Sequence, residues 1–228
     1  MQSVLPLEFE DIDLSQRASL SDLVYARLRE EIMSGLWRPG DRLTIRGQAA
    51  RFRTSPTPVR DAMLQLAGEQ ALTLAPRSFR IPTMAKGRFM EIRKMRVALE
   101  TMAAEEAAAA APFSVADDLD AIHEELARVK AGGDARNTMI LNRHFHFTLY
   151  AGAGMPQCLD AIKALWARAA PYQHYLYVHP CPQTPETHAH LRIIDALRRR
   201  DGALAREAVR LDITVRSTPI NDDLFAGN

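Results

Sequence analysis

The chain has 228 residues, 47% of them hydrophobic and 25% charged, which is the composition of a folded protein of one or two domains. This composition excludes a mainly disordered or collagen-like chain, and no apolar stretch approaches the roughly 20 residues that a membrane-spanning helix needs. Two cysteines are too few for a disulfide framework or a four-thiolate zinc site. Residues 1–16 are acidic and do not resemble a secretory leader, so we expect a cytoplasmic protein with no membrane partner.

The net charge of +1 conceals an asymmetry along the chain. Residues 15–88 carry 13 basic and 6 acidic side chains, whereas residues 89–228 carry 16 basic and 18 acidic ones. A compact basic segment before a slightly acidic remainder favours a nucleic-acid module followed by a second domain. A solvated arginine-rich face would give the same balance.

The basic segment predicts three helices and a hairpin. Apolar residues at helical spacing follow Ser19 and Asp22, which form a capping box, and Gly35 ends this first helix. A turn at residues 38–41 precedes a short helix over residues 45–52. A third helix begins at Ser55 as its cap, with proline in the first turn, and ends near Gly68. Short extended runs on either side of residues 76–78 predict a hairpin.

After residue 86 the pattern predicts helices only. They span residues 88–111, 115–131, 135–152, 157–178, 185–199 and 203–217, with Ser114 and Thr184 as caps of two of them. The expected fold is mainly α: a winged helix–turn–helix with a small β-hairpin wing, then an antiparallel bundle of six or seven helices. The expected division is a tail over 1–18, the winged module over 19–83, a linker over 84–88, the helical domain over 89–218 and a tail over 219–228.

The second helix of a helix–turn–helix pair enters the major groove with its N-terminal residues at the base edges. That end carries Ser55, Thr57 and Arg60 here, and hydroxyl and guanidinium groups suit phosphates and base edges. Arg46 on the preceding helix, and Arg77 and Arg80 on the hairpin, are placed to reach the flanking backbone. Taken singly, Ser55 is equally well explained as a helix cap and Arg60 as a surface arginine in an ion pair.

Several segments resemble the GntR family of bacterial transcription regulators. They are Tyr25-Ala-Arg-Leu-Arg-Glu-Glu-Ile32, Ser34-Gly35, Pro39-Gly40-Asp41-Arg-Leu43 and Ser55-Pro-Thr-Pro-Val-Arg-Asp-Ala62. The resemblance implies a homodimer on a near-palindromic operator DNA, with a small organic acid as effector, and places the DNA contacts on Arg46, Ser55, Thr57 and Arg60. The sequence departs from the family at Pro56, where arginine is frequent, and at Ser78, which stands where the wing tip has glycine.

The later segments Arg96-Val-Ala-Leu-Glu100, Asn142-Arg-His-Phe-His146 and His190-Leu-Arg-Ile-Ile-Asp-Ala-Leu197 are similar to the FadR-type ligand-binding domain, called FCD. Metal-binding members of that domain use one aspartate and three histidines. The four matching positions here are Asn142, His146, His190 and Asp212, so aspartate is replaced by asparagine and the last histidine by aspartate. Two imidazoles and one carboxylate still suit a divalent transition metal, whether zinc, nickel or manganese. The alternative is a metal-free branch in which both histidines are hydrogen-bonded pocket residues.

The other polar candidates in the bundle carry weaker signals. Arg96 is expected to bind a small carboxylate effector together with His146 and His190, or else to pair with an acid on a neighbouring helix. His144 is expected to point away from this set, and four histidines have no motif support: His123, His174, His179 and His188. The aromatic residues Trp166, Tyr172, Tyr175 and Tyr177 are expected in the core and at an interface.

Two other classes of protein compete with a ligand-responsive regulator. A metal-dependent enzyme would use the same four bundle residues, but the sequence has no phosphate loop, nucleophile elbow or HExxH helix, and an enzyme has no use for the winged module. A pure dimerisation scaffold would not explain the polar set inside the bundle. We therefore expect a DNA-binding regulator rather than an enzyme.

Overall fold

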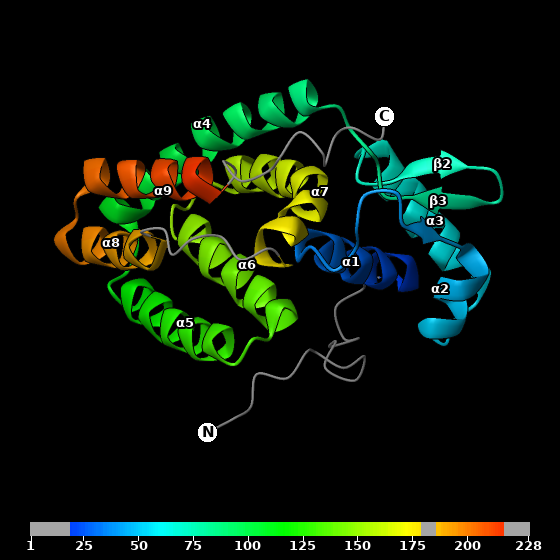
Figure 1. Cartoon of the computed structure of the whole chain (residues 1–228), viewed down its shortest axis with the longest axis horizontal. Helices are drawn as coiled ribbons and strands as arrows, with labels where there is room; N and C mark the ends of the chain where they lie inside the picture. The colour runs from blue at the N-terminus through cyan, green and yellow to red at the C-terminus, as the bar shows by residue number, and fades with distance from the viewer. Residues whose placement is uncertain (1–18, 179–185, 217–228) are drawn as a thin grey trace.

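The computed structural model describes residues 19–178 and 186–216 (Figure 1). The N-terminal part holds helices α1 (Leu20–Met33), α2 (Ile45–Arg51) and α3 (Pro56–Gly68) with strands β1 (Arg42–Leu43), β2 (Thr73–Ala75) and β3 (Ser78–Arg80). The remainder forms α4 (Lys86–Ala110), α5 (Ser114–Ala131), α6 (Ala135–Ala151), α7 (Pro156–Val178), α8 (Glu186–Arg199) and α9 (Gly202–Arg216). The mainly α architecture with a winged module and a helical bundle is thereby confirmed.

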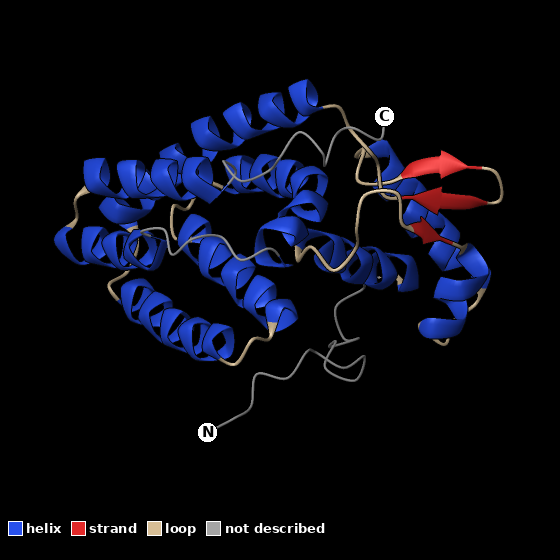
Figure 2. Ribbon diagram, in the orientation of Figure 1, coloured by secondary structure: helices blue, strands red, loops and turns tan. Residues whose placement is uncertain are grey.

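The N-terminal part is a winged helix–turn–helix with a three-stranded sheet at the end of the molecule farthest from the bundle (Figure 2). The Ser19–Asp22 capping box starts α1 as predicted, and Gly35 follows its end with a φ of 65°. The strand order is β1-β3-β2, both pairs antiparallel, with Leu43 and Leu74 each opposite Phe79. Val24, Leu28 and Ile32 of α1 are fully buried in the core of this module.

Three local predictions about this chain need correction, and one short strand was not predicted. Strand β1 was not expected, because two residues after a turn carry no periodicity. Ser55 precedes α3, but its side chain makes no capping hydrogen bond. Ser78 is buried in β3 rather than at the wing tip, where Arg77 has the positive φ of 56°. Ser114 lies inside the first turn of α5, whose cap residue is Phe113 and makes no side-chain cap.

Six helices of the described residues, α4 to α9, form the bundle, in agreement with the expected six or seven. The bounds differ from the prediction by at most two residues at each end, and α4 begins inside the span expected as a linker. The predicted cap Thr184 lies outside the described residues, as do the side chains of His174, Tyr175, Tyr177, His179 and His188. Small side chains let α4 and α9 approach closely, since Ala104, Ala107 and Ala108 face Ala205 and Ala208 in one buried cluster.

The winged module is joined to the bundle by more than the chain itself. Helix α1 packs against α7 as well as against α3, and it lies between the two parts in Figure 1. Arg143 of α6 donates to Glu30 Oε1 at 2.7 Å and to Ser34 Oγ at 3.0 Å, at the end of α1. At the start of α4, the Met84 amide donates to the Tyr172 hydroxyl at 2.6 Å. Within the described ranges, no helix is long and apolar enough to cross a membrane.

Candidate DNA-binding face and buried polar site

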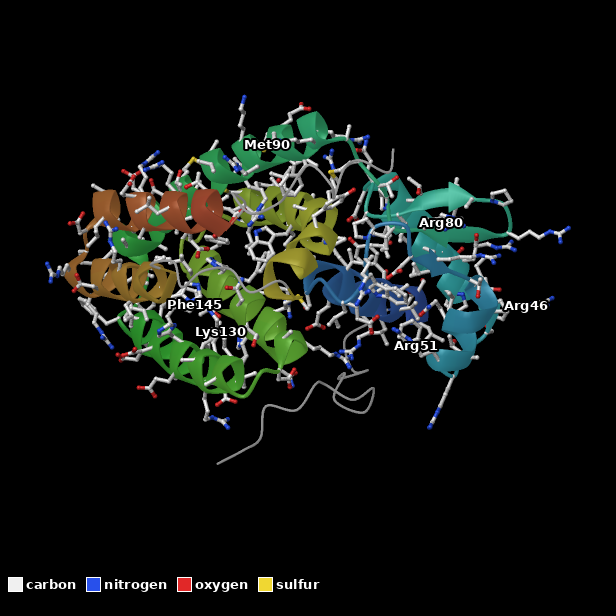
Figure 3. All side chains as sticks on the ribbon, in the orientation of Figure 1. Arg46, Arg51, Arg80, Met90, Lys130 and Phe145 are labelled. Carbon is white, nitrogen blue, oxygen red and sulfur yellow. The ribbon has the colours of Figure 1, made fainter. Side chains whose placement is uncertain are left out.

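All six residues predicted to contact DNA are exposed on the winged module. Arg46 extends from α2 into solvent, and Arg80 lies on the three-stranded sheet (Figure 3). The structure places the others on α3 and the wing: Ser55, Thr57, Arg60 and Arg77. Because the side chain of Ser55 does not cap α3, its hydroxyl is not committed to the helix and remains suited to a phosphate.

The sheet adds a basic residue that the sequence analysis missed. Arg42 on β1 lies directly opposite Arg80 on β3, and both are exposed. Like charges at paired positions of antiparallel strands repel each other. Arg80 Nη1 donates to the Gly40 carbonyl at 2.9 Å, which ties its side chain to the turn before β1. The pair therefore concentrates positive charge on the wing, where a phosphate would relieve the repulsion.

Inside the bundle, the four predicted metal residues are all buried. His146 on α6, His190 on α8 and Asp212 on α9 offer ligand atoms that lie within 4.8 Å of one another. His146 Nε2 is 3.1 Å from Asp212 Oδ2. Asn142 precedes His146 by one helical turn, and its buried Oδ1 has no hydrogen-bond partner among the described residues. Two imidazoles, a carboxylate and an amide oxygen without a partner fit a divalent transition metal.

Aromatic rings enclose this cluster. Phe145 of α6, labelled in Figure 3, stacks on His190 with ring centroids 4.0 Å apart. His123 of α5 meets His190 edge to face at 5.4 Å, although no sequence motif assigns it a role. Its spacing from Leu119 and Leu126 on the buried face of α5 is the signal that was overlooked. Burial lowers the pKa of His123 below its usual value.

Arg96 is buried and paired, but with a different partner than expected. Its Nε lies 2.6 Å from Glu100 Oε1 and its Nη2 3.2 Å from Glu100 Oε2, one turn along the same helix rather than on a neighbouring one. The guanidinium also lies 4.5 Å from the ring centroid of Trp166. The guanidinium has five N–H donors, so this pair leaves others for an effector carboxylate. Trp166 and Tyr172 are core residues, as expected.

Tyr150 connects the Arg96–Glu100 pair to the histidine cluster. Its hydroxyl donates to Glu100 Oε2 at 2.7 Å and lies 3.3 Å from His146 Nδ1. Burial, followed by the adjacent Glu100 carboxylate, raises the pKa of Tyr150 well above its usual value. Neither Glu100 nor Tyr150 was singled out from the sequence, although each lies four residues after a residue that was: Arg96 and His146.

Comparisons with known families agree with both parts of this geometry. Residues 20–78 match the model described as bacterial regulatory proteins, gntR family, and residues 91–214 match the FCD domain. The chain belongs to the GntR family of bacterial regulators and carries an FCD domain. The resemblance stated from the sequence is therefore confirmed.

Named relatives are also regulators. The HTH-type transcriptional regulator McbR of Escherichia coli strain K12 is 30% identical over 82% of this chain and 86% of its own length. The HTH-type transcriptional repressor GlaR of the same strain is 26% identical over 90% of this chain and 96% of its own length. The solved structure of E. coli McbR superposes with a TM-score of 0.82 at 29% identity, over 87% of this chain and 95% of that one. These comparisons show a DNA-binding transcription regulator and not an enzyme.

Proposed function

We propose that this GntR-family regulator responds to a small carboxylate, which its helical domain senses through a bound divalent transition metal. The observation that carries the proposal is the buried cluster of His146, His190 and Asp212, with Asn142 Oδ1 unpartnered one turn away. A bound zinc, nickel or manganese ion would act there as a Lewis acid for the effector carboxylate. His146, His190, Asp212 and Asn142 would hold the ion, and the effector would lie near Arg96, His146 and His190.

The winged module supplies the output of this sensor. We infer that it binds operator DNA as one half of a homodimer, because half-sites about one helical turn apart are read by paired recognition helices. Arg46, Ser55, Thr57 and Arg60 would contact the operator from the helices, and Arg77 and Arg80 from the wing. The proposed division assigns residues 19–83 to DNA binding and 89–218 to sensing and dimerisation, in a cytoplasmic protein.

The test measures operator binding and metal content on the same protein. Fluorescence anisotropy of the full chain with duplexes from its own upstream DNA should give different affinities in zinc and in chelator. His146→Ala combined with His190→Ala should lower the metal found by elemental analysis, remove the zinc-dependent gain in thermal stability and abolish that difference. His144→Ala is the matched control, since His144 is exposed on the same helix.

Each part of the proposal has its own contrary result. If wild-type protein takes up none of zinc, nickel or manganese, the proposed metal site is excluded. Equal operator affinities in zinc and in chelator, across a panel of small carboxylates, would remove sensing but leave DNA binding intact.

A further inference from the structure

Five buried residues form one continuous line of polar contacts across the bundle. The line runs from Arg96 through Glu100, Tyr150 and His146 to Asp212, and each neighbouring pair has atoms within 3.3 Å. It joins helices α4, α6 and α9. Since every buried donor in such a line needs an acceptor, the direction of the hydrogen bonds between Arg96 and His146 follows from the chemistry of the Arg96 end.

The direction is set at the Arg96 end. A guanidinium only donates, so both oxygens of Glu100 accept from Arg96, at 2.6 and 3.2 Å. Because both oxygens of Glu100 accept, the single Tyr150 hydroxyl proton is donated to Glu100 Oε2 at 2.7 Å. What remains on the Tyr150 oxygen is a lone pair, which faces His146 Nδ1 at 3.3 Å.

We propose that Glu100 and Tyr150 are positioning residues that hold a proton on His146 Nδ1 and thereby leave Nε2, the nitrogen beside Asp212, as the one that takes up the ion. The inference deepens the proposed metal site, because Nε2 is then the nitrogen that binds the ion. Outer hydrogen-bond partners of a metal-binding histidine fix its tautomer and ring orientation in this way. Arg96 acts at the far end of the line by donating to both oxygens of Glu100, which leaves them as acceptors.

The first test compares two buried tyrosines. Tyr150→Phe removes the acceptor that faces His146, whereas Tyr172→Phe removes a hydroxyl that binds the Met84 backbone in a separate buried cluster. Isothermal titration of the full chain with zinc should show an affinity about 10–100-fold weaker for Tyr150→Phe than for wild type. Tyr172→Phe should match wild type, and equal affinities for both variants would overturn the proposal.

The second test reads the proton itself. Long-range proton–nitrogen spectra of the labelled chain, with His146→Gln used to assign the ring, should show a protonated Nδ1 with and without zinc. In Tyr150→Phe the metal-free ring should lose this preference. A wild-type Nδ1 without a proton overturns the inference, even if zinc binds. If wild type binds no zinc, the metal proposal fails while the metal-free spectrum still decides this one.

A third test uses a variant that reverses the direction of the hydrogen bonds from Glu100 to His146. The amide of Glu100→Gln can accept from Arg96 through its oxygen and donate to Tyr150 through its nitrogen, so the tyrosine proton becomes free to point at Nδ1. The proton of His146 should then move to Nε2 and zinc affinity should fall. Circular dichroism checks that the variant folds, and Tyr150→Phe keeps the inference testable if it does not. A folded Glu100→Gln with an unchanged tautomer would contradict the assigned direction.

Discussion

At the scale of single residues, the exposed winged module and the buried cluster of this regulator use charge in opposite ways. On the winged module the predicted contacts are exposed, so their charge is available to a polyanion. Inside the bundle, Arg96 and Glu100 neutralise each other over 2.6 Å and hold their neighbours in place. Substitutions on the winged module should therefore change operator affinity, whereas substitutions in the buried cluster should change the geometry of that cluster.

Arg60 is one of the exposed residues of the winged module and lies one turn into α3. Arg60→Ala should weaken operator binding by about 1–3 kcal/mol if the guanidinium contacts a base edge, measured by anisotropy at fixed salt. Arg136→Ala, an exposed arginine on α6, should leave operator affinity unchanged. Unchanged affinity in Arg60→Ala as well would place Arg60 outside the interface.

His123 makes stability depend on pH. Burial depresses its pKa in the folded chain, so below its ordinary pKa near 6.5 the unfolded chain binds a proton that the folded chain does not. Stability is lost as the pH falls from about 7 toward the folded pKa. In chelator, the free energy of unfolding of wild type should fall more steeply over this window than that of His123→Leu. Parallel curves for the two proteins would refute the assignment.

At the scale of secondary-structure elements, α6 links the buried site to the DNA-binding part. Asn142 and His146 face the cluster inside the bundle, while Arg143 between them donates to Glu30 and Ser34 of α1. Helix α1 carries the core of the winged module. A small movement of α6 on occupancy of the site would therefore act on the orientation of the module, provided that the ligand favours one arrangement over the other.

Arg143→Ala tests this link. The variant should bind zinc as wild type does, but the ratio of its operator affinities in zinc and in chelator should fall toward one, from the 5–150-fold range that is typical of allosteric coupling (about 1–3 kcal/mol). Arg128→Ala is the control, because its partner Glu125 lies on the same helix and away from α1. A ratio that survives in Arg143→Ala would exclude this contact as the link.

Local signals in the sequence predicted the helices well, but they could not predict contacts between residues far apart in the chain. Capping and periodicity gave the helices to within two residues at each end, because both are properties of adjacent residues. The four cluster residues followed from the family pattern. Glu100 pairs with Tyr150 fifty positions away, and no local rule selects one acid among the many on α4 to α6 for that contact. Ser78 was misplaced because Arg77, which does not favour a positive φ, occupies the turn.

At the scale of the whole molecule, a basic face and a buried polar cluster lie in two parts joined by α1 and the start of α4 (Figure 1). Such an arrangement separates the proposed DNA contacts from the proposed effector contacts. Any coupling between them must then be reciprocal, since binding free energies at two sites of one molecule are linked.

Two measurements on the full chain examine this reciprocity together. The logarithm of the operator association constant should fall steeply and linearly with the logarithm of the salt concentration, because contacts with phosphates release counterions. A carboxylate that changes operator affinity by some factor should show its own affinity changed by the same factor when operator is present. Identical carboxylate titrations with and without operator would rule out sensing by this site.

Several contacts of different kinds lie within one short stretch of α6, which limits the substitutions that relatives of this protein can accept there. Residues 142–146 include two members of the buried cluster, the contact to α1 and the ring stacked on His190. If the proposed sensing holds, a lineage that changes its effector by altering this stretch would disturb the contact with α1 in the same step, whereas the proposed operator contacts on α3 could vary independently. New operators should therefore be acquired more readily than new effectors. Effector changes should accumulate first on α8 and α9, where substitutions leave the contact with α1 untouched.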